Sequence, residues 1–146
     1  MDVFEKTFEV RWADVDANQH MRHSAYYDYA AHLRVQLLEA LGMGVRLLAK
    51  NKIGPVLFRE EAKFFREIGI IAEIRVNVQL KSMRADGSRW TFVHEFYKDE
   101  GEVATLVTVD GAWLDLTQRK LTALPQQLLD YTNEIPRTND FCLSDE

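Results

Sequence analysis

The spacing of apolar residues changes partway along this chain from the spacing of a helix to that of strands, and this change limits the folds available. From Ser24 to Leu41 apolar residues recur at helical spacing, with Ser24 as a suitable N-cap and Gly42 and Gly44 as stop signals. After Gly54 the pattern becomes that of strands. A single helix with one apolar stripe has to bury it, and an antiparallel sheet is the only large partner. The sequence therefore predicts an α+β fold with the helix packed against the sheet.

Strand-like segments separated by turn residues predict five strands, whose bounds are given at the end of this paragraph. At the C-terminal end, Pro125 opens a short helix that runs to Tyr131, and the polar tail from Thr132 is expected to be poorly ordered. We expect one domain over residues 1–146, with a core over about residues 3–132 and a tail over 133–146. The expected strands cover residues 4–12, 56–65, 74–80, 89–97 and 103–116, with turns at Gly69, 85–88 and 99–101.

Charge and cysteine content exclude several classes of protein. A net charge of -5 and a pI near 5.4 argue against non-specific nucleic-acid binding, which needs a basic face. Cys142 is the single cysteine, so we expect no disulfide framework and a reduced, cytoplasmic setting. The first residues lack the pattern of an export signal, and no apolar run approaches the ~20 residues that span a bilayer. We therefore expect no nucleic-acid partner and no membrane insertion.

Two carboxylates and two imidazoles lie close together between the first expected strand and the helix. They are Asp14, Asp16, His20 and His23. Loops held by rigid elements often carry catalytic groups, and the start of a helix adds backbone donors and partial positive charge. This loop is the candidate active site.

The spacing of these residues resembles a known family. The pattern Arg11-x-x-Asp14-x-Asp16-x-x-x-His20, followed by Tyr26 and Tyr29, resembles the hotdog-fold acyl-CoA thioesterases of the 4-hydroxybenzoyl-CoA thioesterase family. The strand-rich remainder, down to residues 115–120 and the Leu-Pro pair at 124–125, follows the same order of elements.

The resemblance implies a curved antiparallel five-stranded sheet wrapped around one long central helix. It implies hydrolysis of an acyl or aroyl thioester to free acid and CoA-SH, with Asp16 as nucleophile or as base for water. Backbone amides around His23 and Ser24 would polarise the thioester carbonyl. The resemblance requires no cofactor and no metal, and it implies a homodimer or a dimer of dimers.

The residues of the loop also support this chemistry directly, although each has another reading. Asp16 could be a turn residue, but the neighbouring acid and histidines favour catalysis. Asp14 is assigned to fixing the loop by bonds to backbone amides. His20 could orient the loop or hold the substrate carbonyl or water. Arg22 and His23 stand where many relatives carry asparagines, which leaves backbone donation as the role of this segment.

The other histidines and Asp28 have separate interpretations. His94 is expected in the core or pocket wall, and His32 on a solvated or interface face of the helix. Asp28 is a second candidate for the catalytic carboxylate. A zinc or manganese site built from the acids and histidines of the loop fits no standard ligand spacing.

Substrate contacts are predicted at two further places. Lys81, Arg84 and Arg89 flank the expected hairpin and could bind the phosphates of coenzyme A, because guanidinium groups bind phosphate oxygens in pairs. The alternative is a solvated hairpin tip. Tyr26 belongs to the helix stripe that forms the core and the wall of the acyl pocket.

Two other functions remain open at this stage. One is a non-catalytic module that binds acyl-CoA or another acyl ligand, and the other is hydration or dehydration of an acyl thioester on the same fold. The sequence does not specify acyl chain length, aromatic preference, or coenzyme A against an acyl-carrier protein.

Overall fold

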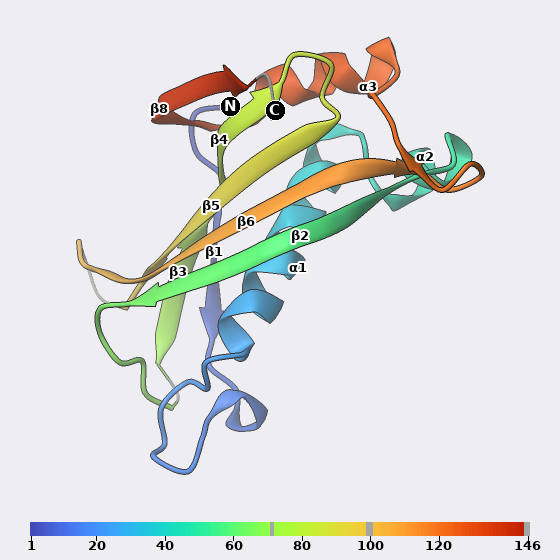
Figure 1. Ribbon diagram of the computed structural model, residues 1–146. Helices are drawn as coiled ribbons and strands as arrows, with labels where there is room; N and C mark the ends of the chain where they lie inside the picture. The colour runs from blue at the N-terminus through green and yellow to red at the C-terminus, as the bar shows by residue number, and fades with distance from the viewer. Residues whose placement is uncertain (71, 99–100, 145–146) are drawn as a thin grey trace.

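The computed structural model describes residues 1–70, 72–98 and 101–144. A curled sheet lies against helix α1, and the loop before α1 hangs below one end of the sheet (Figure 1). The strands are β1 (Glu5–Glu9), β2 (Ile53–Phe64), β3 (Glu73–Asn77), β4 (Gln79–Arg84), β5 (Arg89–Tyr97), β6 (Val103–Asp115), β7 (Lys120–Leu121) and β8 (Arg137–Ser144). The helices are α1 (Ala25–Leu41), α2 (Val45–Lys50) and α3 (Gln126–Tyr131), with 3-10 turns η1 (Trp12–Asp14) and η2 (Thr132–Glu134).

The sheet is built around β5. One edge of β5 pairs with β6, which pairs in turn with β2, and the other edge pairs with β3 and β4. β1 adds to β3, and β8 adds to β4 as the one parallel pair in the described sheet. All five expected strands are present, but the sheet has eight strands rather than five. Val78 interrupts the expected strand of residues 74–80, and the short β7 and the C-terminal β8 add two more.

Helix α1 supplies the apolar stripe that the sheet buries. Its apolar residues facing the sheet are almost inaccessible, and Leu33 and Leu37 are fully buried. They join Val76, Phe96 and Val107 of the sheet in one core. Burying a leucine stabilises a fold by about 1.5–3 kcal/mol, so this face anchors the helix on the sheet.

The ends of the helices agree only partly with the sequence. Gly42 ends α1 with φ +92°, which only glycine adopts easily, and Pro125 precedes α3 as expected. Ser24 is the N-cap residue of α1, but its hydroxyl accepts from Arg22 Nη1 instead of capping an amide. Gly44 begins α2, a helix that the sequence did not indicate because only six residues form it.

The prediction of a poorly ordered tail from Thr132 is wrong. β8 runs parallel to β4, with Ser82 beside Cys142 and Arg84 beside Ser144. Backbone pairing along an open edge needs no strongly apolar sequence, so the polar composition concealed this strand.

The expected turns have different outcomes. Gly87, with φ +78°, closes the β4–β5 hairpin as predicted. At the turn of residues 99–101, Asp99 and Glu100 lie outside the described residues, and Gly101 has φ +84°.

Candidate active site

The loop between β1 and α1 folds back on itself. Val15 and Met21 form a two-residue bridge, and the amide of Asp16 donates to the carbonyl oxygen of His20 at 2.8 Å. Gln19 has φ +62°, which allows the tight return. The loop therefore holds Asp16 and His20 next to each other on a defined backbone.

Asp14 is the buried anchor of this loop. Its side chain is fully buried and accepts from Arg11 Nε at 2.9 Å and Arg11 Nη2 at 2.8 Å, and also from the Tyr29 hydroxyl. The hydrogen bonds from Arg11 lower the pKa of Asp14 to about 2. The predicted fixing role agrees with this geometry, although a guanidinium and a phenol do more of it than backbone amides. Asp14 is therefore ionised and fully engaged.

Asp16 faces solvent at the mouth of a pocket. One of its carboxylate oxygens accepts from the amides of Asn18 at 2.9 Å and His20 at 3.2 Å. Within the described residues, its other oxygen has no partner. These bonds fix the orientation of the carboxylate and leave one oxygen available to react with water or a substrate.

The loop pocket has a volume of about 320 Å³. Its second wall is the segment that follows β2, tied to the loop by Met21 N donating to the Ile68 carbonyl oxygen at 2.6 Å and by a bridge between His20 and Gly69. The pocket is lined by Asp16, His20, Met21, His23, Tyr26, Phe64, Phe65, Arg66, Glu67 and Ile68.

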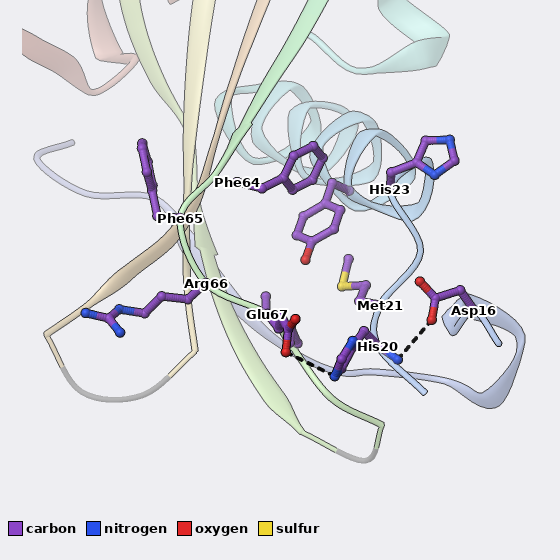
Figure 2. Close-up of a pocket in the computed structure, with 10 residues that line it drawn as sticks. Asp16, His20, Met21, His23, Phe64, Phe65, Arg66 and Glu67 are labelled. Carbon is purple, nitrogen blue, oxygen red and sulfur yellow. Dashed lines mark hydrogen bonds and ion pairs between the residues drawn. The ribbon is translucent and has the colours of Figure 1, made fainter. Parts of the chain in front are cut away.

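Glu67 contacts the ring of His20 across this pocket, which the sequence did not predict. Figure 2 shows His20 between Asp16 on one side and Glu67 on the other, with His20 Nε2 at 3.2 Å from a Glu67 carboxylate oxygen. Asp16 thus contacts the backbone amide of His20, and Glu67 contacts its imidazole ring. No local motif marks Glu67, because it reaches the site from the far end of β2.

An aromatic wall completes the loop pocket. Tyr26 is buried, and its ring meets Phe64 edge-on at 5.1 Å between centroids and Phe96 at 5.2 Å. Burial raises the pKa of the Tyr26 hydroxyl, which keeps it protonated and able to donate. Phe65 and Arg66 point away from the other labelled side chains in Figure 2. Tyr26 therefore lies at the apolar side of the pocket, as expected.

The start of α1 borders the pocket through His23, whereas Ser24 does not line it. In the described part of the chain, the amides of His23 and Ser24 donate to no carbonyl or side-chain oxygen. Free amides at the positive end of a helix can stabilise an oxyanion.

The predicted phosphate-binding residues lie away from this pocket. Lys81 and Arg84 belong to β4 and Arg89 to β5, around a hairpin at the opposite end of the sheet from the loop (Figure 1). Arg89 lines a different, polar pocket of about 380 Å³ together with Thr91 and Asp110. Within one chain, these cations and the loop pocket are separate.

The remaining candidates are also placed. Asp28 pairs with Arg22 at 3.7 Å and faces a third pocket with His32, which is exposed. His94 is fully buried, in agreement with the core reading. Among the described residues, no group of three or more histidine, cysteine or acidic side chains is arranged to hold a metal ion. Asp14 is engaged by Arg11 and also lies 3.9 Å from Nη2 of Arg22.

The pocket unites the elements needed to attack a carbonyl carbon. It holds a solvent-exposed carboxylate with a free oxygen, an imidazole fixed by a second carboxylate, and a helix start with free amides. Met21, Tyr26, Phe64 and Ile68 give the pocket an apolar side. No helix in the described part of the chain is both long and apolar enough to cross a membrane.

Comparisons with known proteins identify relatives of this architecture. The family model for the thioesterase-like superfamily matches residues 10–131. No relative is found among curated proteins.

Solved structures share the fold at low sequence identity. A hypothetical protein from Staphylococcus aureus in complex with CoA has a TM-score of 0.83 and 16% identity, covering 94% of this chain and 89% of that one. A 1,4-dihydroxy-2-naphthoyl-CoA thioesterase from Synechocystis has a TM-score of 0.79 and 16% identity, over 90% and 96% of the two chains. The probable thioesterase YbaW from Escherichia coli has a TM-score of 0.79 and 18% identity, covering 92% of this chain and 99% of that one. The overall fold is therefore that of these proteins.

Proposed function

This chain belongs to the thioesterase-like superfamily, and from that premise we propose that it is a hotdog-fold acyl-CoA thioesterase that releases a free acid and CoA-SH. The observation that carries the proposal is the meeting of Asp16 and the start of α1 at one pocket. Structural neighbours that bind CoA or hydrolyse an aroyl-CoA favour coenzyme A as the thiol carrier.

Asp16 supplies the attack on the thioester carbonyl carbon. Its free oxygen either removes a proton from water as the water attacks, or attacks directly to form an anhydride that water then cleaves. In both routes the carbonyl oxygen becomes an oxyanion, which the amides around His23 and Ser24 stabilise. Collapse of this intermediate breaks the carbon–sulfur bond, and the departing thiolate takes up a proton to give CoA-SH.

His20 and Glu67 act as a pair beside Asp16. The Glu67 carboxylate fixes the ring of His20, whose backbone amide donates to Asp16. With Nε2–H donating to Glu67, Nδ1 of the neutral ring can accept a hydrogen bond from the attacking water. Glu67 is a positioning residue, because it acts through His20.

The nucleotide end of coenzyme A needs cations at the mouth of the pocket. Arg66 borders the loop pocket but points outward and pairs with Glu102 at 3.2 Å, so it could meet a phosphate only at the outer rim and by leaving Glu102. Lys81, Arg84 and Arg89 remain a second proposal. In one chain they lie at the other end of the sheet, so they can serve a loop pocket only across a subunit boundary.

We also propose that the chain forms a homodimer or a pair of dimers, in a cytoplasmic setting. β2 pairs with β6 along one edge, and the described residues provide no partner for its other edge. Leu57 and Phe58 are exposed on this 12-residue strand. A long open edge with exposed apolar side chains favours pairing with a second copy.

A panel of acyl thioesters tests the function. Aliphatic and aromatic acyl-CoAs and the same acyl groups on an acyl-carrier protein would be assayed for release of free thiol. Thiol release from acyl-CoA is expected. Tight binding without any thiol release would instead identify a binding module, and reaction only with enoyl or hydroxyacyl substrates would identify a hydratase.

A further inference from the structure

Arg34 is a buried cation in the middle of helix α1. It is only 9% exposed, and burial lowers its pKa to about 10. Arginine is almost never buried without an anionic or strongly polar partner, because removing its charge from water is costly. Its partners therefore need to be accounted for.

The partner that Arg34 has in the sheet is neutral. Arg34 Nη1 lies 2.9 Å from His94 Nε2, and His94 Nδ1 lies 2.9 Å from the backbone oxygen of Asn77. Since a backbone oxygen only accepts, Nδ1 carries the proton and Nε2 accepts from Arg34. Burial lowers the pKa of His94 to about 3, which agrees with a neutral ring. One of the five guanidinium N–H donors is satisfied in this way.

Glu60 does not provide a direct counter-charge for Arg34. Glu60 of β2 raises the pKa of Arg34 through its charge, but it is exposed and forms no ion pair with Arg34. In the described part of the chain, no acidic side chain lies within ion-pair distance of the guanidinium. The positive charge is left without a direct counter-charge.

This cation lines an apolar pocket of about 190 Å³ between α1 and the sheet. Val35, Leu38, Leu57, Phe92 and Trp113 contribute its apolar walls. Leu57 also lies on the β2 strand whose open edge we propose for the dimer, so this wall borders the subunit boundary. The ring of Trp90 also lines it. The pocket thus places the positive charge of Arg34 inside an otherwise apolar lining.

We propose that this pocket, which we name the Arg34 pocket, binds an apolar carboxylate, with the carboxylate on the guanidinium of Arg34 and the hydrocarbon among the apolar walls. The carboxylate group replaces the missing counter-charge, and hydrogen bonds to charged groups are stronger than neutral ones. The Arg34 pocket shares no lining residue with the loop pocket. It is therefore a second site on the same helix.

Two sources could supply such a group. One is a free fatty acid that binds by itself. The other is the far end of an acyl chain that ends in a second carboxylate, and this second source alone rests on the proposed function. In both cases a carboxylate binds Arg34 and a hydrocarbon chain lies among the apolar walls.

Binding of octanoate and octan-1-ol to the native protein tests the site without any variant. Calorimetry should give an affinity for octanoate at least ~10-fold higher than for the alcohol, because a charged hydrogen bond contributes about 1.5–3 kcal/mol. The indole N–H signal of Trp90 in a ¹⁵N spectrum should shift with octanoate. Equal affinities for the two ligands would overturn the proposal.

Variants then locate the site. Arg34→Met should abolish the preference for octanoate over octan-1-ol, Arg34→Lys should keep part of it, and Glu60→Gln should strengthen octanoate binding about twofold by removing a repulsive charge. If Arg34→Met does not fold, Ala31→Leu fills the pocket from the neighbouring turn on the same face of α1, and Ala40→Leu is its matched control outside the pocket. Octanoate binding that survives Ala31→Leu, or a folded Arg34→Met, would contradict the assignment.

Hydrolysis separates the two sources. If the carboxylate belongs to the acyl chain, kcat/KM should be higher for an acyl-CoA with a terminal carboxylate than for its methyl-ended analogue, and Arg34→Met should remove the difference. If the ligand is a free acid, octanoate should bind without competing with acyl-CoA. Absence of all thioester hydrolysis would reject the proposed function, while the octanoate result would still decide the site.

Discussion

The Nε2 atom of His20 lies 3.2 Å from a carboxylate oxygen of Glu67, although the two residues come from separate loops. Glu67→Ala should lower kcat about tenfold with an unchanged melting temperature. Loss of a positioning contact should lower kcat less than loss of the group that moves the proton itself, for which the smallest expected effect is ~100-fold. Glu67→Gln should restore most activity, because its amide oxygen can still accept from His20.

Glu73→Ala is the matched control, since Glu73 is an exposed glutamate of β3 outside the loop pocket. A loss of kcat in Glu67→Ala that comes with an equal loss of stability would point to a structural role. Full activity in Glu67→Ala would remove Glu67 from the site.

Acid should weaken the fold through His94. Its pKa is about 3 in the folded protein, whereas an unfolded chain returns it to the ordinary histidine pKa of 6.5, so between these values only the unfolded chain binds the proton. The free energy of unfolding should therefore fall as pH falls through this window, by at most about 1.4 kcal/mol per pH unit. Asp14 acts in the same direction at lower pH: its contribution is present above 3.8 and is lost as pH falls through about 2.

Urea unfolding at pH 7, 6 and 5 measures this dependence. His94→Gln should flatten it, whereas His32→Gln, on the exposed face of α1, should leave the slope unchanged. Equal slopes in His94→Gln and the native protein would show that another group controls acid stability.

Much of this fold follows from hydrophobic period alone. The helix up to Leu41 and the five strands appear where the spacing of apolar residues predicts them, although the first strand ends at Glu9 instead of Trp12 and Val78 divides the third. The Gly87 hairpin appears where its turn residues predict it. α2 and β8 were not predicted, since six residues give little period and an edge strand is held by backbone pairing rather than by apolar side chains.

Only the part of the site that lies in the loop before α1 was predictable from the sequence. Asp16, His20 and His23 are close in sequence, so their grouping was visible, whereas Glu67 and Phe64 join them through the length and direction of β2. The same geometry separates the loop from Arg89: the strands carry that cation to the opposite end of the sheet. Tertiary distances of this kind have no local signal.

Arg66, which pairs with Glu102 at the outer rim of the loop pocket, is proposed to contact the nucleotide of coenzyme A. Arg66→Ala should raise KM for acyl-CoA about fivefold, the effect of losing ~1 kcal/mol, and should leave a short thioester without the nucleotide unaffected. Steady-state kinetics on both substrates measures this. If the paired variant Arg84→Ala and Arg89→Ala raises KM instead, the phosphates reach the hairpin of another subunit.

The open edge of β2 predicts the assembly. Light scattering should give a mass of about twice the 17.0 kDa of the chain, or four times if dimers pair. Phe58→Glu should weaken association by placing a charge on the exposed edge. A mass of 17.0 kDa under active conditions would contradict the proposed dimer.

The most direct measurement is kcat of Asp16→Asn on acyl-CoA. Asparagine keeps the shape and can accept the same amide bonds, but it neither attacks a thioester nor takes a proton from water. The account predicts a folded protein that binds acyl-CoA with at least ~100-fold lower kcat. Asp14→Asn is the control. It should lower the free energy of unfolding by about 1–3 kcal/mol and have a smaller effect on kcat, because the Asp14 carboxylate holds Arg11 and Tyr29. A folded Asp16→Asn protein with the kcat of the native enzyme would contradict the mechanism.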